Sequence, residues 1–354
     1  MSVFGRKTKS YPESTEAQAK RRREFRFRAS LCILSGAMLG LSFPPFPLGV
    51  FACFALVPWL IVLADIDEMG TSLRYSYLAF FVFHLITLNW TGGYVHMHDP
   101  YMMIAGAVTM IAHPLFYFLP TAGYVLARKY LGGRVALVAL PFLWVGYEYS
   151  HSLSEWSFPW ITVGNSQSYN LAGIQFISAT GIYGLSFWIV IINVLAFILY
   201  SRLAQGVWLP KEKKSILMAV TIVAVYYLPC IHGGIVLSQN PPGEPERPVT
   251  VGIIQSNIDP WEKWAKSSFK TIEIHLELSQ SLLRDSSRPK PDLLLWPETA
   301  IPFYLLTKEN TSLLKHVREK IDSLRVPVLT GLPNAVYYED STKAPPSAKR
   351  LWTT

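Results

Sequence analysis

The sequence has few charged residues and few cysteines. Charged residues make up 16% of its 354 residues, against about 25% in a typical soluble domain, so an ordinary soluble enzyme is a poor match. Three cysteines are too few for a disulfide scaffold, and a hydrophobic content of 51% excludes a disordered or collagen-like chain. A mean hydropathy of +0.26 instead favours a membrane protein with a polar part attached.

The formal net charge of +8 raises the question of nucleic-acid binding, and the position of the charge decides it. Residues 1–236 hold 17 Lys and Arg against 10 Asp and Glu, a net of +7. Residues 237–354 hold 15 against 14, a net of +1. The excess therefore lies in the apolar part, where basic residues orient a chain in the bilayer, and we expect no nucleic-acid partner.

Seven apolar segments approach the roughly 20 residues that a helix needs to cross a bilayer. They cover residues 30–43, 46–64, 73–92, 101–127, 134–150, 182–201 and 214–236. Pro114 and Pro120 interrupt the fourth segment and predict a kink there. The sequence thus predicts a membrane α-helical bundle of about seven spans, in contact with the lipid bilayer.

Basic residues are confined to alternate loops. They occur in the N-terminal tail through Arg28 and in the second, fourth and sixth loops, while the first, third and fifth loops hold none. The positive-inside rule then predicts a cytoplasmic N-terminus. With seven spans, everything after residue 236 would lie on the outer side of a bacterial inner membrane.

Four regions follow from these patterns. They are a basic cytoplasmic tail over 1–29, a transmembrane bundle over 30–236, a linker over 237–248 and a further domain over 249–354. The linker is rich in proline and glycine, including Pro241, Pro242 and Gly243.

The last region alternates between strand and helix patterns. We predict strands over 249–254, 292–296 and 327–330, and helices over 266–284 and 308–324. This alternation predicts an α/β layer with at least partly parallel strands. About 110 residues with so few strands make a marginal core, so we expect an incomplete domain.

The most suggestive polar residue is Glu298, which directly follows Trp296 and Pro297 at the end of the second predicted strand. Ligand sites in open α/β sheets lie outside the carboxyl ends of strands. A carboxylate partly shielded there could act as a general base. The alternative is an acid that only caps a turn.

Three further features allow both a functional and a structural interpretation. The loop from Gln255 to Trp264, which contains Asn257, is either an interfacial aromatic anchor or a substrate loop facing lipid. Glu148, near the outer end of the fifth segment, either shapes a binding site or is solvated at the interface. Trp160 fits an interfacial aromatic belt equally well.

Metal and thiol chemistry have little support. Polar residues near 89–99, among them His96, His98 and Asp99, lack a nearby cysteine or a tight His-x-x-His pattern, so we expect no metal and no cofactor. Cys32, Cys53 and Cys230 all lie in or beside apolar segments and are interpreted as small buried residues. Residues 249–354 hold no cysteine, and therefore no thiol nucleophile.

Several separated motifs occur together and in order. They are Leu41-Ser42-Phe43-Pro44-Pro45-Phe46 with Trp59; Phe158-Pro159-Trp160 with Gly164, Ser166, Gln167, Gly181, Tyr183-Gly184 and Ser186-Phe187; Gln255, Asn257-Ile258 and Lys263-Trp264; and Trp296 through Pro302 with Thr330-Gly331. In this combination the chain resembles the apolipoprotein N-acyltransferases, over most of its length.

The resemblance implies an inner-membrane acyltransferase with a periplasmic nitrilase-like (carbon–nitrogen hydrolase) domain of the αββα sandwich type. Such enzymes transfer an acyl chain from a membrane phospholipid to the lipidated N-terminal cysteine of a diacylglyceryl apolipoprotein, by a ping-pong route with a Glu-Lys-Cys triad. Glu298 matches the glutamate that acts as general base, and Trp264 matches a loop tryptophan that handles lipid. Gln255, Asn257, Glu148 and Trp160 are the further candidates for substrate binding.

The sequence departs from that family after Glu298. The family's lysine and cysteine lie downstream of the glutamate, but Lys343 and Lys349 lack the family's surrounding pattern and no cysteine follows Cys230. We therefore expect a fragment, split or frameshifted product that does not catalyse the transfer by itself. The alternatives are a catalytically dead membrane protein that binds lipid or lipoprotein, and a transporter-like bundle, although paired repeats are not evident.

Overall fold

A computed structural model describes residues 15–93, 99–206, 212–240, 248–258 and 268–335. The chain divides into two compact units, Met1–Pro241 and Pro242–Thr354, and each is considered by itself. We call them the helical unit and the α/β unit.

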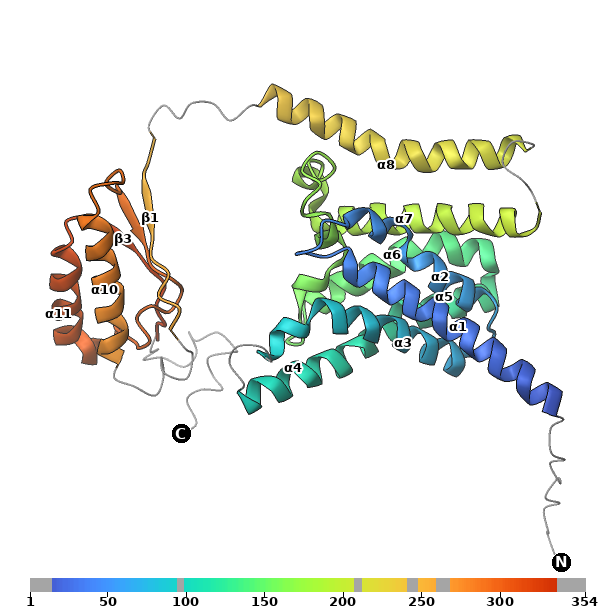
Figure 1. Cartoon of the computed structure of the whole chain (residues 1–354), viewed down its shortest axis with the longest axis horizontal. Helices are drawn as coiled ribbons and strands as arrows, with labels where there is room; N and C mark the ends of the chain where they lie inside the picture. Colours follow the sequence, from blue (N-terminus) through green and yellow to red (C-terminus); the bar gives the residue numbers. More distant parts are fainter. Residues whose placement is uncertain (1–14, 94–98, 207–211, 241–247, 259–267, 336–354) are drawn as a thin grey trace, which may run out of the picture. The chain divides into compact units, whose positions relative to one another are not determined.

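The helical unit consists of helices that pack side by side (Figure 1). Its helices are α1 (Thr15–Leu41), α2 (Ala52–Ala64), α3 (Met69–Thr87), α4 (Pro100–Ala112), α5 (Phe118–Leu131), α6 (Gly133–Ser152), α7 (Ile177–Ala204) and α8 (Lys213–Gln239). Short 3₁₀ turns connect them, namely η1 (Gly49–Phe51), η2 (Asn89–Gly92), η3 (His113–Tyr117), η4 (Pro159–Ile161) and η5 (Val163–Gln167).

Two of these elements bear directly on the sequence predictions. The interruption expected at Pro114 is present, because the 3₁₀ turn η3 separates α4 from α5 where proline removes a backbone donor, whereas Pro120 lies within α5 and a kink stays a prediction. Helix α1 begins at Thr15, well inside the region expected to be a polar tail. Its first half is rich in Ala, Gln, Lys, Arg and Glu, all of which favour helix even when they are exposed.

Within the described ranges, three helical segments are long and apolar enough to cross a membrane by length and composition. They are Pro100–Leu131, Ile177–Ala204 and Lys213–Gln239, and Gly49–Ala64 is a shorter apolar segment. Helices α1, α3 and α6 lie at the other expected segments, and an arrangement of seven spans stays a prediction. Many apolar side chains of α4 and α8 face outward, as contact with lipid requires.

The interior of the helical unit is aromatic and contains buried polar groups that are hydrogen-bonded across helices. Trp59 and Trp144 meet edge to face with ring centroids 6.3 Å apart, and Trp59 Nε1 donates to Ser76 Oγ at 2.8 Å. Asn193 of α7 is fully buried beside α2. Its Oδ1 accepts the Leu56 N–H at 2.8 Å, and its Nδ2 donates to the Ala52 carbonyl at 2.7 Å.

Replacing Asn193 by leucine keeps the approximate volume but leaves backbone groups of α2 without their partner. We expect Asn193→Leu to lower the unfolding free energy of the full chain by about 1–3 kcal/mol, measured by thermal unfolding in detergent. Thr221→Val is the matched control, because the Thr221 hydroxyl donates to the Leu217 carbonyl within its own helix. Equal effects of the two substitutions would contradict the role assigned to Asn193.

An ion pair joins the end of α7 to the start of α8. The Ser215 hydroxyl donates to Glu212, and the Arg202 guanidinium pairs with the same carboxylate. Both contacts favour the ionised form, so the pKa of Glu212 lies below its ordinary value, with the Ser215 hydrogen bond as the larger cause.

Because the folded-state pKa of Glu212 is lowered, its stabilising contribution is present above the unfolded-state pKa and is lost as the pH falls through the folded-state value. We expect the melting temperature of Glu212→Gln to lie below that of the original chain near neutral pH, and the two to converge in acid. Glu155→Gln, at an exposed loop carboxylate, serves as control. If the difference in melting temperature between the two chains instead grew as the pH fell, the lowered pKa assigned to Glu212 would be wrong.

The α/β unit contains a three-stranded parallel sheet in the order β1-β2-β3. Strands β1 (Val251–Ile253), β2 (Leu293–Leu295) and β3 (Val328–Leu329) are joined through helices α10 (Ser268–Arg284) and α11 (Thr311–Asp322). The register pairs Val251 with Leu293 and Leu294 with Val328. These elements coincide with the predicted strands and helices to within a few residues.

Both helices cover the same face of the sheet (Figure 1). Leu294 and Trp296 are buried beneath them together with Ile272 and Val317. On the opposite face Ile253 is 74% exposed and Leu329 is 61% exposed. The described part of this unit is therefore one layer of helices on one sheet, and a second layer of the αββα type stays a prediction.

Candidate functional site

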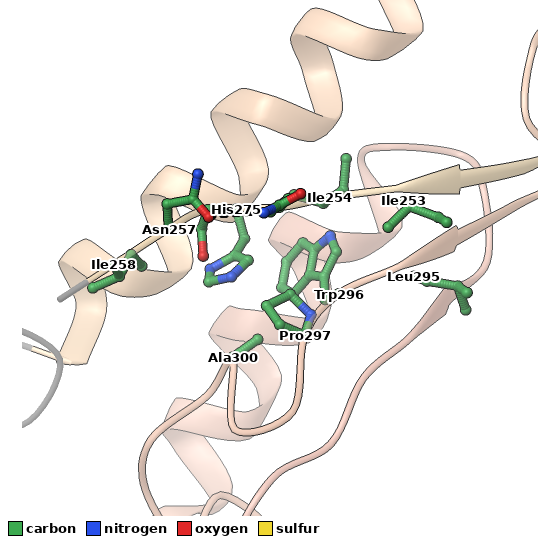
Figure 2. Close-up of a pocket in the computed structure, with 11 residues that line it drawn as sticks. Ile253, Ile254, Asn257, Ile258, His275, Leu295, Trp296, Pro297 and Ala300 are labelled. Atoms are coloured by element: carbon green, nitrogen blue, oxygen red, sulfur yellow. Dashed lines mark hydrogen bonds between the residues drawn. The ribbon is translucent and has the colours of Figure 1, made fainter. Parts of the chain in front are cut away.

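A cavity of about 410 Å³ lies at the carboxyl ends of β1 and β2 (Figure 2). Its lining comes from the end of β1, from α10, and from the end of β2. The lining residues are Ile253, Ile254, Gln255, Ser256, Asn257, Ile258, His275, Leu295, Trp296, Pro297 and Ala300. The position agrees with the general location of ligand sites in parallel sheets.

The inner wall of this cavity is formed by His275 and Trp296. Their ring centroids are 5.3 Å apart, and both side chains are buried. Trp296 Nε1 donates to Ser279 Oγ at 2.9 Å, and the Ser279 hydroxyl donates to the His275 carbonyl at 2.7 Å. This network fixes the indole plane and presents an aromatic wall to the cavity.

His275 and Ser279 were not among the residues singled out from the sequence. They follow Thr271 at intervals of four along α10, so the three form a row on the buried face of the helix. His275 Nδ1 contacts the Thr271 carbonyl at 2.6 Å, which satisfies one ring nitrogen within the helix. In the sequence, this polar row runs beside the apolar residues Ile272 and Leu276. That spacing could have indicated that polar residues share the buried face of the helix.

Two of the predicted binding residues lie at the edge of the cavity. Gln255 Nε2 donates to Asn257 Oδ1 at 3.0 Å, and both follow β1 directly. Asn257 has a φ of 48°, in the left-handed region that asparagine tolerates better than most residues. The chain therefore turns at Asn257, and the two amide side chains give the apolar cavity a polar edge.

The predicted base, Glu298, is exposed and lies on the turn that follows β2. Its chain neighbours Pro297 and Ala300 line the cavity, whereas Glu298 itself is not among the lining residues. Gly331, which follows β3, lies against it, since a Cβ added to Gly331 would be 3.5 Å from Glu298 Cα. The ends of all three strands therefore meet around Glu298 and the cavity edge. Trp264 falls outside the described residues.

The other two predicted residues belong to the helical unit. Glu148 of α6 is only 7% exposed, and its Oε1 accepts the Trp144 indole N–H at 3.0 Å and the Val163 backbone N–H at 2.8 Å. The carboxylate thus joins α6 to the segment containing Phe158, Pro159 and Trp160.

Trp160 is largely exposed beside Trp90, with ring centroids 5.3 Å apart. Both rings line a surface groove of about 260 Å³. Its other lining residues are Phe43, Pro44, Thr87, Leu88, Asn165 and Ser168. Asn165 Nδ2 donates to the Pro159 carbonyl at 2.9 Å and holds the Trp160 segment against the helices.

The polar residues near 89–99 include one helix cap among those that the structure describes. Asp99 Oδ1 accepts the backbone N–H groups of Tyr101 and Met102 and so caps α4, while His96 and His98 lie outside the described residues. In the part of the chain that the structure describes, no three His, Cys, Asp or Glu side chains are placed to hold a metal ion. Cys32 and Cys53 are buried and Cys230 is half-buried.

Removing the Ser279 hydroxyl leaves the Trp296 indole N–H without its acceptor inside the α/β unit. We expect Ser279→Ala to lower the unfolding free energy by about 1–2 kcal/mol and to broaden or shift Trp296 fluorescence, measured on the full chain. Ser281→Ala, on the exposed side of the same helix, should leave both quantities unchanged. An equal loss in the two variants would mean that helix propensity, and not the hydrogen bond, is responsible.

Comparison with known proteins shows which family this chain is similar to. A family model described as "Apolipoprotein N-acyltransferase N-terminal domain" matches residues 35–195, which lie in the helical unit. Proteins named apolipoprotein N-acyltransferase are similar to both units. One from Chlorobaculum tepidum is 33% identical over 314 residues, covering 86% of this chain and 55% of the relative.

Two other relatives show the same pattern of coverage. A protein of that name from Geobacter metallireducens is 30% identical over 77% of this chain and 51% of its own length. Another from Gloeobacter violaceus is 27% identical over 88% of this chain and 57% of its own length. The chain thus spans about half the length of the curated relatives it matches, and it is a homologue of the apolipoprotein N-acyltransferases.

Proposed function

We propose that this homologue of the apolipoprotein N-acyltransferases contributes the membrane unit and the general base for N-acylation of apolipoproteins. The acyl donor is a membrane phospholipid, and the acceptor is the lipidated N-terminal cysteine of a diacylglyceryl apolipoprotein. The observation that carries the proposal is the position of Glu298 at the end of β2, beside a cavity, in a unit that follows the apolar helices in the chain.

In this reaction Glu298 takes the proton of a cysteine thiol, whose sulfur attacks the ester carbonyl of the phospholipid. The thioester forms as the ester C–O bond breaks, and the proton passes to the leaving lysophospholipid. The acceptor amine then attacks the thioester, the amide C–N bond forms as the C–S bond breaks, and a proton from the amine passes through Glu298 to the sulfur, which restores the thiol. A lysine would stabilise the negative charge that develops on the carbonyl oxygen in both steps.

In the proposed scheme, neither the thiol nor the lysine is assigned to a residue of this sequence. The three cysteines are Cys32, Cys53 and Cys230, all in the helical unit, and the segment after Cys230 holds none. We propose that these two groups come from polypeptide joined to, or assembled with, this sequence. The 354 residues alone would then bind substrates without turning them over.

The binding residues divide between the two units. Gln255 and Asn257 form the polar edge of the cavity. Trp264, which follows them in the sequence and lies outside the described residues, is the further candidate for handling lipid. Trp160, held by Asn165, supplies an aromatic wall for an acyl chain in the helical unit. Glu148 orients the Trp160 segment through its bond to Val163. No cofactor enters the scheme.

The proposed location is a bacterial inner membrane, with seven spans, a cytoplasmic N-terminus and a periplasmic α/β unit of the nitrilase-like type. The confinement of Lys and Arg to alternate loops supports this orientation. The uncovered apolar residues Ile253 and Leu329 support a second layer on the sheet.

A chimaera tests the role of Glu298. Residues 1–354 are joined to the part of the Chlorobaculum tepidum relative that lies beyond the matched region, and acyl transfer to a diacylglyceryl peptide is measured in membranes lacking the endogenous enzyme. We expect the chimaera to transfer, and Glu298→Gln to lower its rate by about 10²–10⁴-fold, the usual contribution of a general base. The 354 residues alone should show no transfer.

Glu309→Gln in the same chimaera is the control, because Glu309 is exposed on the turn before α11. Full activity of the Glu298→Gln chimaera would contradict the assignment of Glu298 as the general base. An inactive chimaera that still binds phospholipid and diacylglyceryl peptide would instead favour the lipid-binding alternative.

A further inference from the structure

Three buried polar atoms of the helical unit belong to residues that line one small cavity and have no short hydrogen bond among the described residues, although the Ser186 hydroxyl also interacts with the Glu148 carboxyl. They are Nε2 of His113, Oε2 of Glu148 and Nε2 of His151. His113 is 5% exposed and Glu148 is 7% exposed. Leaving such groups unsatisfied in an interior costs about 1–3 kcal/mol each, so their convergence on one space needs an explanation.

The hydrogen bonds behind His113 determine which of its nitrogens carries a proton. His84 Nδ1 lies 2.6 Å from the Phe80 carbonyl, which can only accept, so His84 carries its proton on Nδ1. Because the buried imidazole is neutral, His84 Nε2 is an acceptor, and it lies 2.9 Å from His113 Nδ1. His113, which lines the cavity, therefore donates from Nδ1 and keeps a bare lone pair on Nε2.

The cavity has the size and chemistry of one water site. Its volume is about 20 Å³, and a buried water needs roughly 10–15 Å³ of this kind of volume and two to four polar partners. We propose that a single water molecule occupies it, donating to His113 Nε2 and Glu148 Oε2 and accepting from His151 Nε2. Each of the three atoms then gains a partner, and the water makes three hydrogen bonds.

This water would complete a network that begins at the backbone of α3 and ends at η5. It runs from the Phe80 carbonyl through His84 and His113 to the water, then through Glu148 to the Val163 N–H. The network crosses four elements of the helical unit, and its last bond holds the segment that follows Trp160. The site is therefore a positioning site and takes no direct part in acyl transfer.

Radiolytic labelling of the full chain in lipid nanodiscs tests the proposal, because hydroxyl radicals produced from a bound water oxidise the side chains around it. Tyr147 lines the cavity and is 6% exposed, whereas Tyr124 is 1% exposed and does not line it. We expect Tyr147 to be oxidised several-fold faster than Tyr124. Equal, background-level labelling of the two tyrosines would overturn the proposal.

Variants identify the acceptor. His113→Phe removes the lone pair and should reduce Tyr147 labelling to the level of Tyr124, while His232→Phe, on the exposed face of α8, should not. Glu148→Gln keeps a hydrogen-bonding group toward the water, so Tyr147 should still be labelled in this variant. It serves as a second variant in case His113→Phe does not fold. A metal ion bound at one equivalent per chain, and lost in His113→Phe, would also refute the water assignment.

Discussion

Polar groups inside the helical unit have no bulk water to bond with, and the arrangement of its helices depends on this constraint. Asn193 serves two backbone groups of α2 from α7, and Trp59 finds Ser76 on α3. One carboxylate oxygen of Glu148 accepts hydrogen bonds from both the Trp144 indole N–H and the Val163 backbone N–H. Except for the Trp144 bond, which lies within α6, each of these bonds joins different elements, so satisfying polar groups also selects which helices become neighbours.

The α/β unit is organised by a different condition, which is that its short strands bury one face only. Leu294 and Trp296 lie under α10 and α11, while Ile253 and Leu329 remain exposed on the other side. The cavity forms where the strands end, because the chain must turn there at Asn257 and at Thr299, both with positive φ. The sheet places Glu298, the proposed base, on that turn and two amide side chains on the neighbouring one, although the strands are only two or three residues long.

Periodicity and turn residues were sufficient to locate most elements. The expected helix over 266–284 is α10 at Ser268–Arg284, and the expected strand over 327–330 is β3 at Val328–Leu329. The start of α1 was missed because its charged residues were interpreted as a tail, although their helix propensity is high. Hydropathy proposed seven spans, whereas length and composition mark three helical segments in the described residues.

For the candidate sites, the sequence by itself determined the family resemblance, the apolar and polar halves, and the place of Glu298 after a strand. The tertiary structure alone decided that His275 and Ser279 support Trp296, and that His113, Glu148 and His151 share one cavity. Each cluster joins separate elements, because η3 carries His113 while α6 carries Glu148 and His151, and α10 supports a tryptophan that follows β2. No local sequence pattern records such proximity between elements. It arises only when packing removes these polar groups from water, so that they must hydrogen-bond to one another.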